Sequence, residues 1–290
     1  MSVPQQATFS SVVDLSVGSA PDRFIGPVSP ERGGRTYGGQ LLAQAVQAAY
    51  LTVDDDRQIN SLHALFLRPG AVDETTDWQV ERVREGRSFS TRETSGFQGG
   101  KEIFRLMASF HVPEDGLEFE PPTDFDIASV PPPEEVETTY LDFCQAHPDL
   151  AASDWFGQDR PIEIRYIDPP DPIGGPPLLD PQQTWIRLLG TLTDDPGLHA
   201  AGLAYMADGT LIDHVLLPHG FRWSDARLTG ASLDHAMWFR RSVRVDQWLL
   251  YDQRVESTGG GRGLATGRFY TSTGELVATC TQEGLIRWQD

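Results

Sequence analysis

The sequence has 290 residues but only two cysteines, Cys144 and Cys280, and a single lysine, Lys101. The cysteines are far apart in the chain and match no spacing typical of a metal site or a redox pair, so we expect two reduced thiols. No apolar stretch approaches about 18 residues, which argues against a membrane-spanning helix. The N-terminus also lacks a charged start followed by an apolar run, so we expect no signal peptide and a cytoplasmic location.

Several common catalytic motifs are also missing. The chain has no Gly-x-Ser-x-Gly sequence, which argues against the nucleophile elbow of an α/β-hydrolase. No glycine pattern typical of a dinucleotide-binding or phosphate-binding loop occurs. His, Cys and Asp residues do not cluster at zinc-binding spacings. We therefore expect neither a metal nor an organic cofactor.

Basic residues are few relative to acidic ones. The chain carries 23 Lys and Arg against 42 Asp and Glu, a net charge of -19. Nucleic acids and anionic membranes are bound through basic faces, so neither is expected as a partner. The hydrophobic content of 39% is sufficient for a packed core, and the length allows two domains or two halves that share one core.

The chain does contain an internal duplication. The segment Ala231–Arg241 is similar to Ser61–Pro69 when His235 is aligned with His63. An apolar-periodic segment precedes each of the two motifs, and three alternating runs separated by glycine-containing turns follow each. This pattern predicts a duplicated fold, so the chemistry should arise where the copies differ.

In the first copy, Gly38–Tyr50 is predicted to be a helix because its apolar residues recur at steps of three and four. The predicted strands are Phe9–Val17, Ile59–Leu67, Asp77–Arg84, Ser88–Phe97 and Glu102–Val112. The turns between the last three strands are short and contain glycine, so they can join only antiparallel strands. A helix followed by such a meander is typical of an α+β unit.

The second copy repeats this order, with a helix predicted at about His199–Leu217. Its predicted strands are Thr184–Leu189, Ser232–Phe239, Trp248–Ser257, Leu264–Thr271 and Leu276–Arg287. We assign residues 1–112 to an N-terminal repeat and residues 161–290 to a C-terminal repeat that carries the active site. Residues 113–160 form a proline-rich, acidic connector, with a short helix predicted at Glu134–Ala146.

Three polar residues of the second copy interrupt apolar patterns. Asp208 lies on the apolar stripe of the predicted helix, and Gln282 lies on the apolar face of the last predicted strand. Ser232 opens the strand that carries the duplicated motif. A buried carboxylate or amide without a partner costs about 1–3 kcal/mol, so the three side chains could satisfy one another or hold a water molecule.

Each of the three residues also has a simpler interpretation. An Asp in a helix is often a cap or a solvated side chain, and a Gln in a last strand often marks an edge or a bulge. Ser232 could simply begin its strand. In the first copy Gly39 aligns with Asp208, so the predicted site is single. His235 aligns with His63, which favours a structural role for it.

Five motifs carry a resemblance to a known family. They are Gly38–Gln40, Leu62–Gly70, Leu233–Phe239, Trp248–Tyr251 and Gln282–Arg287. Together they resemble the acyl-CoA thioesterase II family and span about residues 25–112 and 184–288. The resemblance implies the α+β double hotdog fold, in which two tandem repeats of a helix and an antiparallel sheet form one continuous sheet.

The resemblance also implies an activity, which is hydrolysis of fatty acyl-CoA to free fatty acid and CoA without a cofactor. The family uses an Asp in the second helix, a Ser or Thr just before the Asp-His motif and the Gln of Gln-Glu-Gly. These match Asp208, Ser232 and Gln282. Asp208 would accept the proton of a water molecule or orient it, and the other two would fix that water. Acyl-CoA is then the expected partner, together with further copies of the chain in a dimer or tetramer.

Two other functions remain open at this point. A non-catalytic acyl-CoA-binding protein could keep the fold without turnover. An enoyl-CoA hydratase or dehydratase of this architecture would use an Asp and a His in an Asp-x-Asn-Pro-x-His arrangement, whereas Asp208 and His214 are six residues apart without Asn-Pro. The candidate ligands for CoA phosphates are Arg84, Arg87, Arg240, Arg241 and Arg262.

Overall fold

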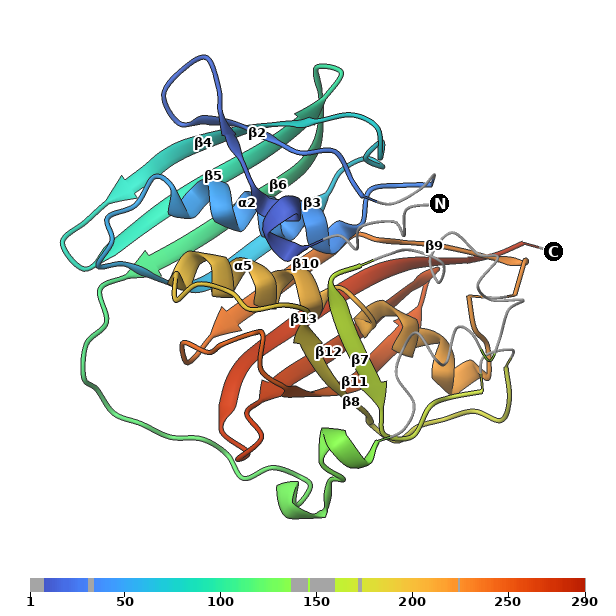
Figure 1. Cartoon of the computed structure of the whole chain (residues 1–290). Helices are drawn as coiled ribbons and strands as arrows, with labels where there is room; N and C mark the ends of the chain where they lie inside the picture. The colour runs from blue at the N-terminus through green and yellow to red at the C-terminus, as the bar shows by residue number, and fades with distance from the viewer. Residues whose placement is uncertain are drawn as a thin grey trace, which may run out of the picture.

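A single antiparallel sheet organises the chain (Figure 1). The computed structural model describes residues 8–30, 34–136, 146, 160–171, 174–223 and 225–289. Within these residues thirteen strands form one sheet in the order β1-β2-β4-β5-β6-β3-β10-β13-β12-β11-β8-β7, and β9 pairs with β13 beside this path. The double hotdog fold predicted from the sequence is therefore confirmed, with the two repeats meeting between β3 and β10.

The first repeat contains one long helix and six strands. The helix α2 spans Gly38–Tyr50, the bounds predicted from its apolar period. The strands are β1 (Ser16–Val17), β2 (Arg23–Gly26), β3 (Gln58–Phe66), β4 (Thr76–Glu85), β5 (Phe89–Gln98) and β6 (Lys101–His111). Consecutive strands from β4 to β6 are joined by tight turns, and all their pairings are antiparallel.

The predicted strand at Phe9–Val17 is wrong. Phe9–Val13 forms the short helix α1, whose Thr8 cap accepts a hydrogen bond from the backbone N–H of Ser11. The buried residues of this segment are Phe9, Val12 and Val13, which is the spacing of a helix face and not of a strand. Only the last two residues of the predicted segment enter the sheet, as β1.

The second repeat contains seven strands and a helix that is followed by a 3-10 segment. The strands are β7 (Ile162–Tyr166), β8 (Gln182–Leu188), β9 (Leu228–Ser232), β10 (Asp234–Phe239), β11 (Leu249–Gly259), β12 (Arg262–Tyr270) and β13 (Leu276–Trp288). The helix α5 spans Pro196–Ala207, and the 3-10 segment η3 spans Leu211–His219. Two short 3-10 turns, η1 (Ile127–Ser129) and η2 (Pro133–Glu135), lie in the connector.

Two predictions for the second repeat need correction, and one strand was missed. The helix predicted at His199–Leu217 ends at Ala207 and resumes as a 3-10 helix at Leu211, because Gly209 and Thr210 interrupt it. The strand predicted at Ser232–Phe239 is two strands, so Ser232 ends β9 instead of opening β10. Strand β7 was not predicted.

A helix was also predicted in the connector, at Glu134–Ala146. Residues 137–145 of it lie outside the described residues, and residues 134 and 135 belong to η2.

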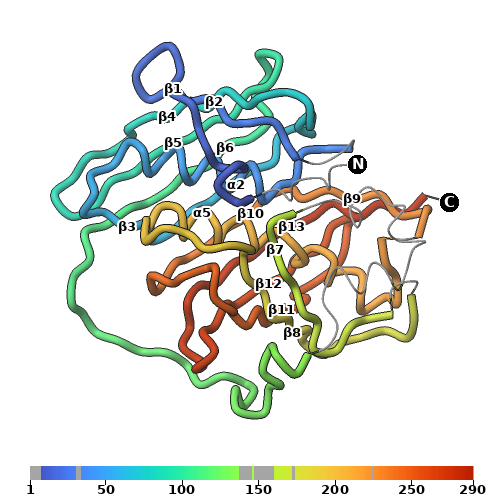
Figure 2. The backbone as a smooth tube through the Cα atoms, viewed as in Figure 1, coloured from blue at the N-terminus to red at the C-terminus, as the bar shows by residue number. Residues whose placement is uncertain are grey.

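The two helices lie side by side and antiparallel on one face of the sheet (Figures 1 and 2). The first residue of α2, Gly38, is beside Asp208 at the end of α5, and Gly197 near the start of α5 is beside Tyr50 at the end of α2. A side chain on Gly39 would collide with the carbonyl oxygen of Tyr205, so this close approach requires a glycine. The core lies between this helix pair and the sheet.

Strands β3 and β10 join the repeats and show how the copies correspond. Met237 pairs with Leu62, and His235 pairs with Ala64. All four of these side chains are buried toward the helices, whereas His63 is exposed on the other face, where its ring contacts Trp238. The sequence alignment of His63 with His235 is therefore shifted by one residue. When the strands are matched by the face of the sheet on which their side chains lie, the counterpart of His235 is Leu62.

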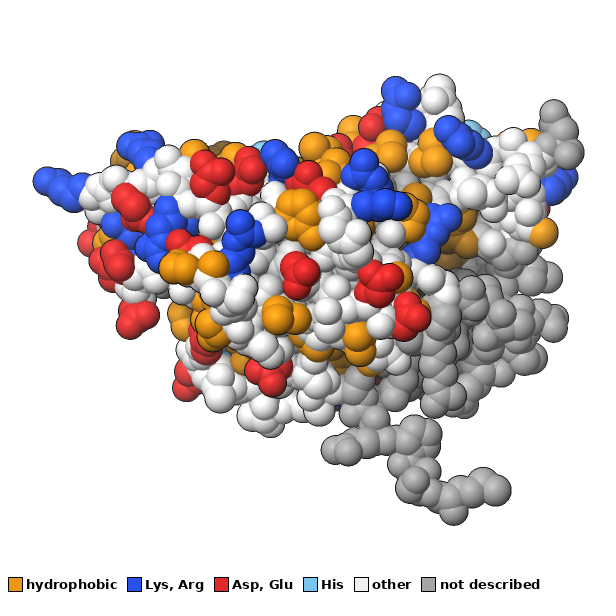
Figure 3. Space-filling view, turned by 90° about the horizontal axis from the view of Figure 1, so that it is seen from above, with side chains coloured by type: hydrophobic (Ala, Val, Ile, Leu, Met, Phe, Trp, Pro, Cys, Tyr) orange, Lys and Arg blue, Asp and Glu red, His pale blue; other side chains and the backbone are white. Residues whose placement is uncertain are grey.

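The surface carries charges of both signs. On the face shown in Figure 3, acidic and basic side chains are interspersed with hydrophobic ones. The connector after β6 runs around the outside of the molecule as an extended chain before η1 (Figure 2). Among the described residues, no helix combines the length and the apolar character needed to cross a membrane.

Candidate active site

The three polar residues singled out in the sequence meet at one point. The Nε2 atom of Gln282 donates to Oδ1 of Asp208 at 2.6 Å and to Oγ of Ser232 at 2.7 Å. Gln282 is fully buried, and Asp208 is only 4% exposed. One amide group therefore bridges a carboxylate and a hydroxyl that lie 24 residues apart in the chain.

Each of the three is positioned by the end or the register of an element. Asp208 caps the C-terminus of α5, where the helix stops before Gly209. Ser232 is the last residue of β9 and pairs with Gly284 of β13, two residues along that strand from Gln282. The alternation of β13 directs Gln282 to the buried face of the sheet, toward the helices.

The electrostatic setting of Asp208 comes from two helix ends. The negative end of the α5 dipole opposes the charge of its carboxylate, while the positive start of α2 at Gly38 favours it. The start of α2 is open because Tyr37, its N-cap residue, makes no capping hydrogen bond with its side chain. The N–H groups of Gln40 and Leu41 bond to the carbonyl oxygen of Tyr37, so the N–H groups of Gly38 and Gly39 are the ones that can serve a ligand.

A cavity of about 620 Å³ opens beside Asp208 and Ser232. Its apolar wall includes Leu41, Phe66, Leu67, Ile212 and Trp223, and its polar wall includes Arg35, Arg68, Arg160 and Asp213. Such a volume lies within the range of small-molecule sites, about 300–1,000 Å³. Mostly apolar walls with a few charged groups suit a ligand that is part hydrocarbon and part anion.

Asp213 is a second carboxyl group in this cavity. Burial raises its pKa to about 7, and the nearby charge of Asp208 acts in the same direction. The indole N–H of Trp223 donates to its Oδ1 atom and partly opposes this rise. Asp213 therefore exchanges its proton near neutral pH beside the ionisable group of the candidate site.

His214 is not part of this site. Its Nδ1 donates to the carbonyl oxygen of Thr210 at 2.9 Å, and burial lowers the pKa of its ring to about 4. It does not line the cavity that contains Asp208. The Asp–His pair on which a hydratase or dehydratase would depend is therefore not assembled there. Among the described residues, no group of three or more His, Cys, Asp or Glu side chains could hold a metal ion.

The arginines that line the cavity are not the five that the sequence suggested as ligands for the phosphates of CoA. None of those five lines the cavity. Arg241 is paired with Glu120 and Arg262 with Glu283, while Arg84 and Arg87 lie at the β4–β5 hairpin. Of the lining arginines, Arg68 lies inside the motif Leu62–Gly70, and Arg35 lies three residues before the motif Gly38–Gln40. These positions were the only available signal for them.

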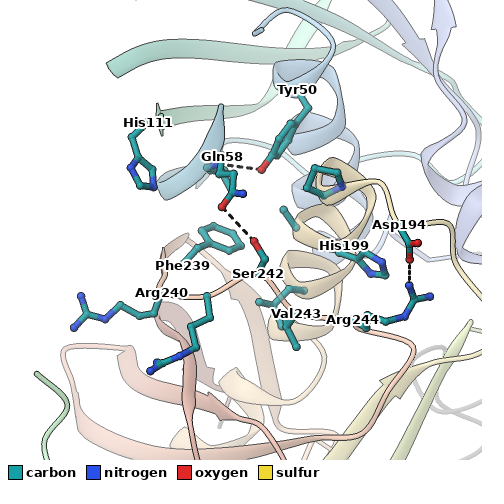
Figure 4. A pocket seen from close by; sticks show the side chains of 15 residues that line it. Tyr50, Gln58, His111, Asp194, His199, Phe239, Arg240, Ser242, Val243 and Arg244 are labelled. Atoms are coloured by element: carbon teal, nitrogen blue, oxygen red, sulfur yellow. Dashed lines mark hydrogen bonds and ion pairs between the residues drawn. The ribbon is translucent and has the colours of Figure 1, made fainter. Parts of the chain in front are cut away.

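A second cavity, of about 310 Å³, lies between the two repeats at the opposite ends of the two helices (Figure 4). Tyr50 of α2 and His199 of α5 point toward it, and Arg240 extends away from it. Two pairs of its polar side chains bond to each other: the Oγ of Ser242 donates to Oε1 of Gln58, and Arg244 pairs with Asp194. This cavity does not contain a polar trio like that of the second repeat.

Cross-strand register explains that difference. Leu51 caps α2 as Asp208 caps α5, so Leu51 and not Gly39 is the counterpart of Asp208. Ala108 pairs with Leu62 in the place where Gln282 stands opposite His235. In the first repeat the three counterparts are Leu51, Ile59 and Ala108, all of them apolar.

The fold defines a double hotdog protein, with one such polar trio among the described residues, and comparisons with known proteins show its family. The family models described as acyl-CoA thioesterase N-terminal domain and acyl-CoA thioesterase C-terminal domain match residues 27–111 and 141–286. Human acyl-coenzyme A thioesterase 8 is 36% identical over 264 residues, which cover 87% of this chain and 81% of that protein.

A bacterial relative and a solved structure give the same result. Acyl-CoA thioesterase 2 of Haemophilus influenzae is 34% identical over 259 residues, covering 88% of this chain and 89% of that protein. The crystal structure of TesB2, an acyl-CoA thioesterase II from Mycobacterium marinum, has a TM-score of 0.78 and 35% identity, and covers 98% of this chain and 99% of that one. The chain belongs to the acyl-CoA thioesterase II family.

Proposed function

We propose that this chain hydrolyses fatty acyl-CoA to a free fatty acid and CoA, using a water molecule held by Asp208, Ser232 and Gln282. As a member of its family it is a thioester hydrolase, and the trio supplies a place where water can be activated. The observation that supports this assignment is the bridging amide of Gln282, which donates to Asp208 at 2.6 Å and to Ser232 at 2.7 Å.

In this proposal Asp208 is the general base. Its Oδ1 is held by Gln282, so the carboxylate cannot rotate freely and can accept the proton of a water molecule that attacks the thioester carbonyl carbon. The Oγ of Ser232 accepts from Gln282, which leaves its own O–H to bond the water or the substrate. Such general-base assistance contributes about 10²–10⁴-fold to the rate.

The start of α2 would stabilise the tetrahedral intermediate. Attack of water places a negative charge on the former carbonyl oxygen, and the N–H groups of Gly38 and Gly39 are donors at the positive end of a helix. Each such donor contributes about 10²–10³-fold. Collapse of the intermediate breaks the C–S bond, and CoA leaves as a thiolate that takes up the proton.

The cavity fits the two parts of the substrate. The acyl chain would lie against Leu41, Phe66 and Trp223, where it is shielded from water. The phosphates of CoA would lie toward Arg35 and Arg68. The assignment of residues 1–112, 113–160 and 161–290, the cytoplasmic location and the assembly into a dimer or tetramer stay predictions. The model of the C-terminal family domain already begins inside the predicted connector, at residue 141.

Turnover of a long-chain acyl-CoA, followed with a thiol reagent, tests the mechanism. Asp208→Asn and Gln282→Ala should each lower kcat by about 10²-fold or more while the protein remains folded. The exposed residues Asp115 and Gln247 provide matched controls as Asp115→Asn and Gln247→Ala, which should keep the activity of the unchanged protein. Wild-type kcat in both site variants would refute the assigned roles. Binding of acyl-CoA by the unchanged chain without thiol release would favour the non-catalytic alternative.

A further inference from the structure

His235 stands next to Gln282 in the buried face of the sheet. Strand β10 pairs with β13 so that Ala236 is opposite Thr281, and one step along the ladder brings His235 opposite Gln282. Both side chains are fully buried. The residues on either side of them in this row are small, with Ala64 opposite His235 on β3 and Ala265 opposite Gln282 on β12. Two polar side chains are therefore enclosed together between alanines.

The remaining polar atoms of these two side chains can satisfy each other by a hydrogen bond. The Nε2 of Gln282 is committed to Asp208 and Ser232, which leaves its Oε1 as the remaining polar atom. That Oε1 and both ring nitrogens of His235 are buried and reach no full hydrogen-bond geometry with any described group. A buried polar atom without a partner is costly, so an N–H donor and a carbonyl acceptor side by side are expected to pair.

The charge state of the ring is suited to this pairing. Burial lowers the pKa of His235 to about 4, and its contact with the Gln282 amide partly opposes this fall. The ring is therefore neutral at physiological pH and carries one N–H donor.

We infer that His235 is a positioning residue whose ring N–H holds Oε1 of Gln282 and thereby fixes the amide with Nε2 toward Asp208 and Ser232. The inference rests on the proposed function. A primary amide can bind in two orientations, and the flipped one would direct Oε1 at the carboxylate of Asp208 and withdraw the donor from Ser232. His235 selects the productive orientation without contacting the substrate, since it does not line the cavity.

The inference predicts that His235 affects turnover and not substrate affinity. His235→Leu should lower kcat about tenfold, the effect expected for one buried hydrogen bond, with KM changed less than about twofold. His235→Asn keeps an N–H donor and should recover most of the lost kcat. The matched control is His63→Leu, which changes the histidine that the sequence aligns with His235 but that lies exposed on the opposite face. It should leave kcat unchanged.

A double-mutant cycle decides whether His235 acts through Gln282. In the Gln282→Ala background, His235→Leu should cause no further loss of kcat, because the group it positions is gone. The same tenfold loss in both backgrounds, or full activity of a folded His235→Leu protein, would overturn the inference. A folding defect is separated from a positioning defect by the recovery in His235→Asn and by thermal unfolding of each variant.

A readout that does not use turnover separates this inference from the proposed function. In the full chain, the ¹⁵N NMR signals of the His235 ring should show a neutral ring near pH 6 with a hydrogen-bonded N–H. That N–H signal should shift when Gln282 becomes Ala. Ring signals that are insensitive to Gln282→Ala would refute the contact even if Asp208→Asn is inactive. A sensitive ring in a protein with fully active Asp208→Asn would uphold the contact and refute the mechanism.

Discussion

A Cβ atom added to Gly38 would lie 2.6 Å from Oδ2 of Asp208. The start of one helix and the end of the other therefore touch through a residue that has no side chain, and the carboxylate occupies the space. The contact also places the first N–H groups of α2 within the candidate site. A side chain at residue 38 would displace Asp208 or push the two helices apart, because the same Cβ would lie 2.9 Å from the Phe66 ring.

We therefore expect Gly38→Ala to lower kcat by about 10²-fold, since small displacements of a catalytic group are costly. Gly259→Ala is the control, because a Cβ there meets nothing within 4 Å. Steady-state kinetics on a long-chain acyl-CoA, together with the melting temperature of each variant, measures the effect. Wild-type kcat in Gly38→Ala would show that Asp208 is not held as described.

The hydroxyl group of Ser232 is the second acceptor of the Gln282 amide. Ser232→Ala removes it and leaves a buried N–H short of one partner, so kcat should fall about tenfold. Ser232→Thr keeps the hydroxyl and restricts rotation about χ1, so its kcat should equal or exceed that of the unchanged protein. If the Thr variant were as slow as the Ala variant, the hydroxyl would not be the group that matters.

Arg35 and Arg68 are expected to bind the phosphates of CoA. The Nη1 of Arg68 donates to the carbonyl oxygen of Glu102, which orients the guanidinium at the cavity. Arg68→Ala should raise KM about tenfold with little change in kcat, and added salt should reduce the difference. Arg240→Ala, at the other cavity, is the matched control. Equal KM values for Arg68→Ala and Arg240→Ala would place the phosphates elsewhere.

The raised pKa of Asp213 predicts a pH dependence of stability. Its pKa is about 7 in the folded chain against an ordinary value of 3.8, so between these values the folded state binds more protons than the unfolded state. The free energy of unfolding therefore decreases as pH rises from about 4 to about 7. Asp213→Asn removes this loss and keeps an acceptor for the indole N–H of Trp223.

We expect Asp213→Asn to melt at a higher temperature than the unchanged protein at pH 8, with the difference shrinking toward pH 4. Thermal unfolding from pH 4 to pH 8 measures it, with the exposed Asp115→Asn as the control. A difference that is constant across this range, or that grows toward pH 4, would show that the carboxyl group of Asp213 does not titrate near neutral pH.

The sequence by itself determined those features that depend on local periodicity. The apolar steps of Gly38–Tyr50 predicted the bounds of α2, and the alternation of the last strand placed Gln282 on the buried face. Both follow from backbone geometry that repeats every 3.6 or 2 residues, so a short window of sequence is enough to detect them. The duplicated motif likewise predicted that two similar units would share a sheet.

Tertiary structure alone decided how the two copies correspond. A shift of one residue exchanges the faces of a strand, so the sequence match of His63 with His235 concealed that one ring is exposed and the other is buried beside Gln282. The end of β9 at Ser232 is set by its pairing with the distant strand β13, which a short window of sequence does not show. The three polar residues and a contact among them were therefore predicted from the sequence. The group that bridges them, the Nε2 of Gln282, and the arginines that line the cavity were not.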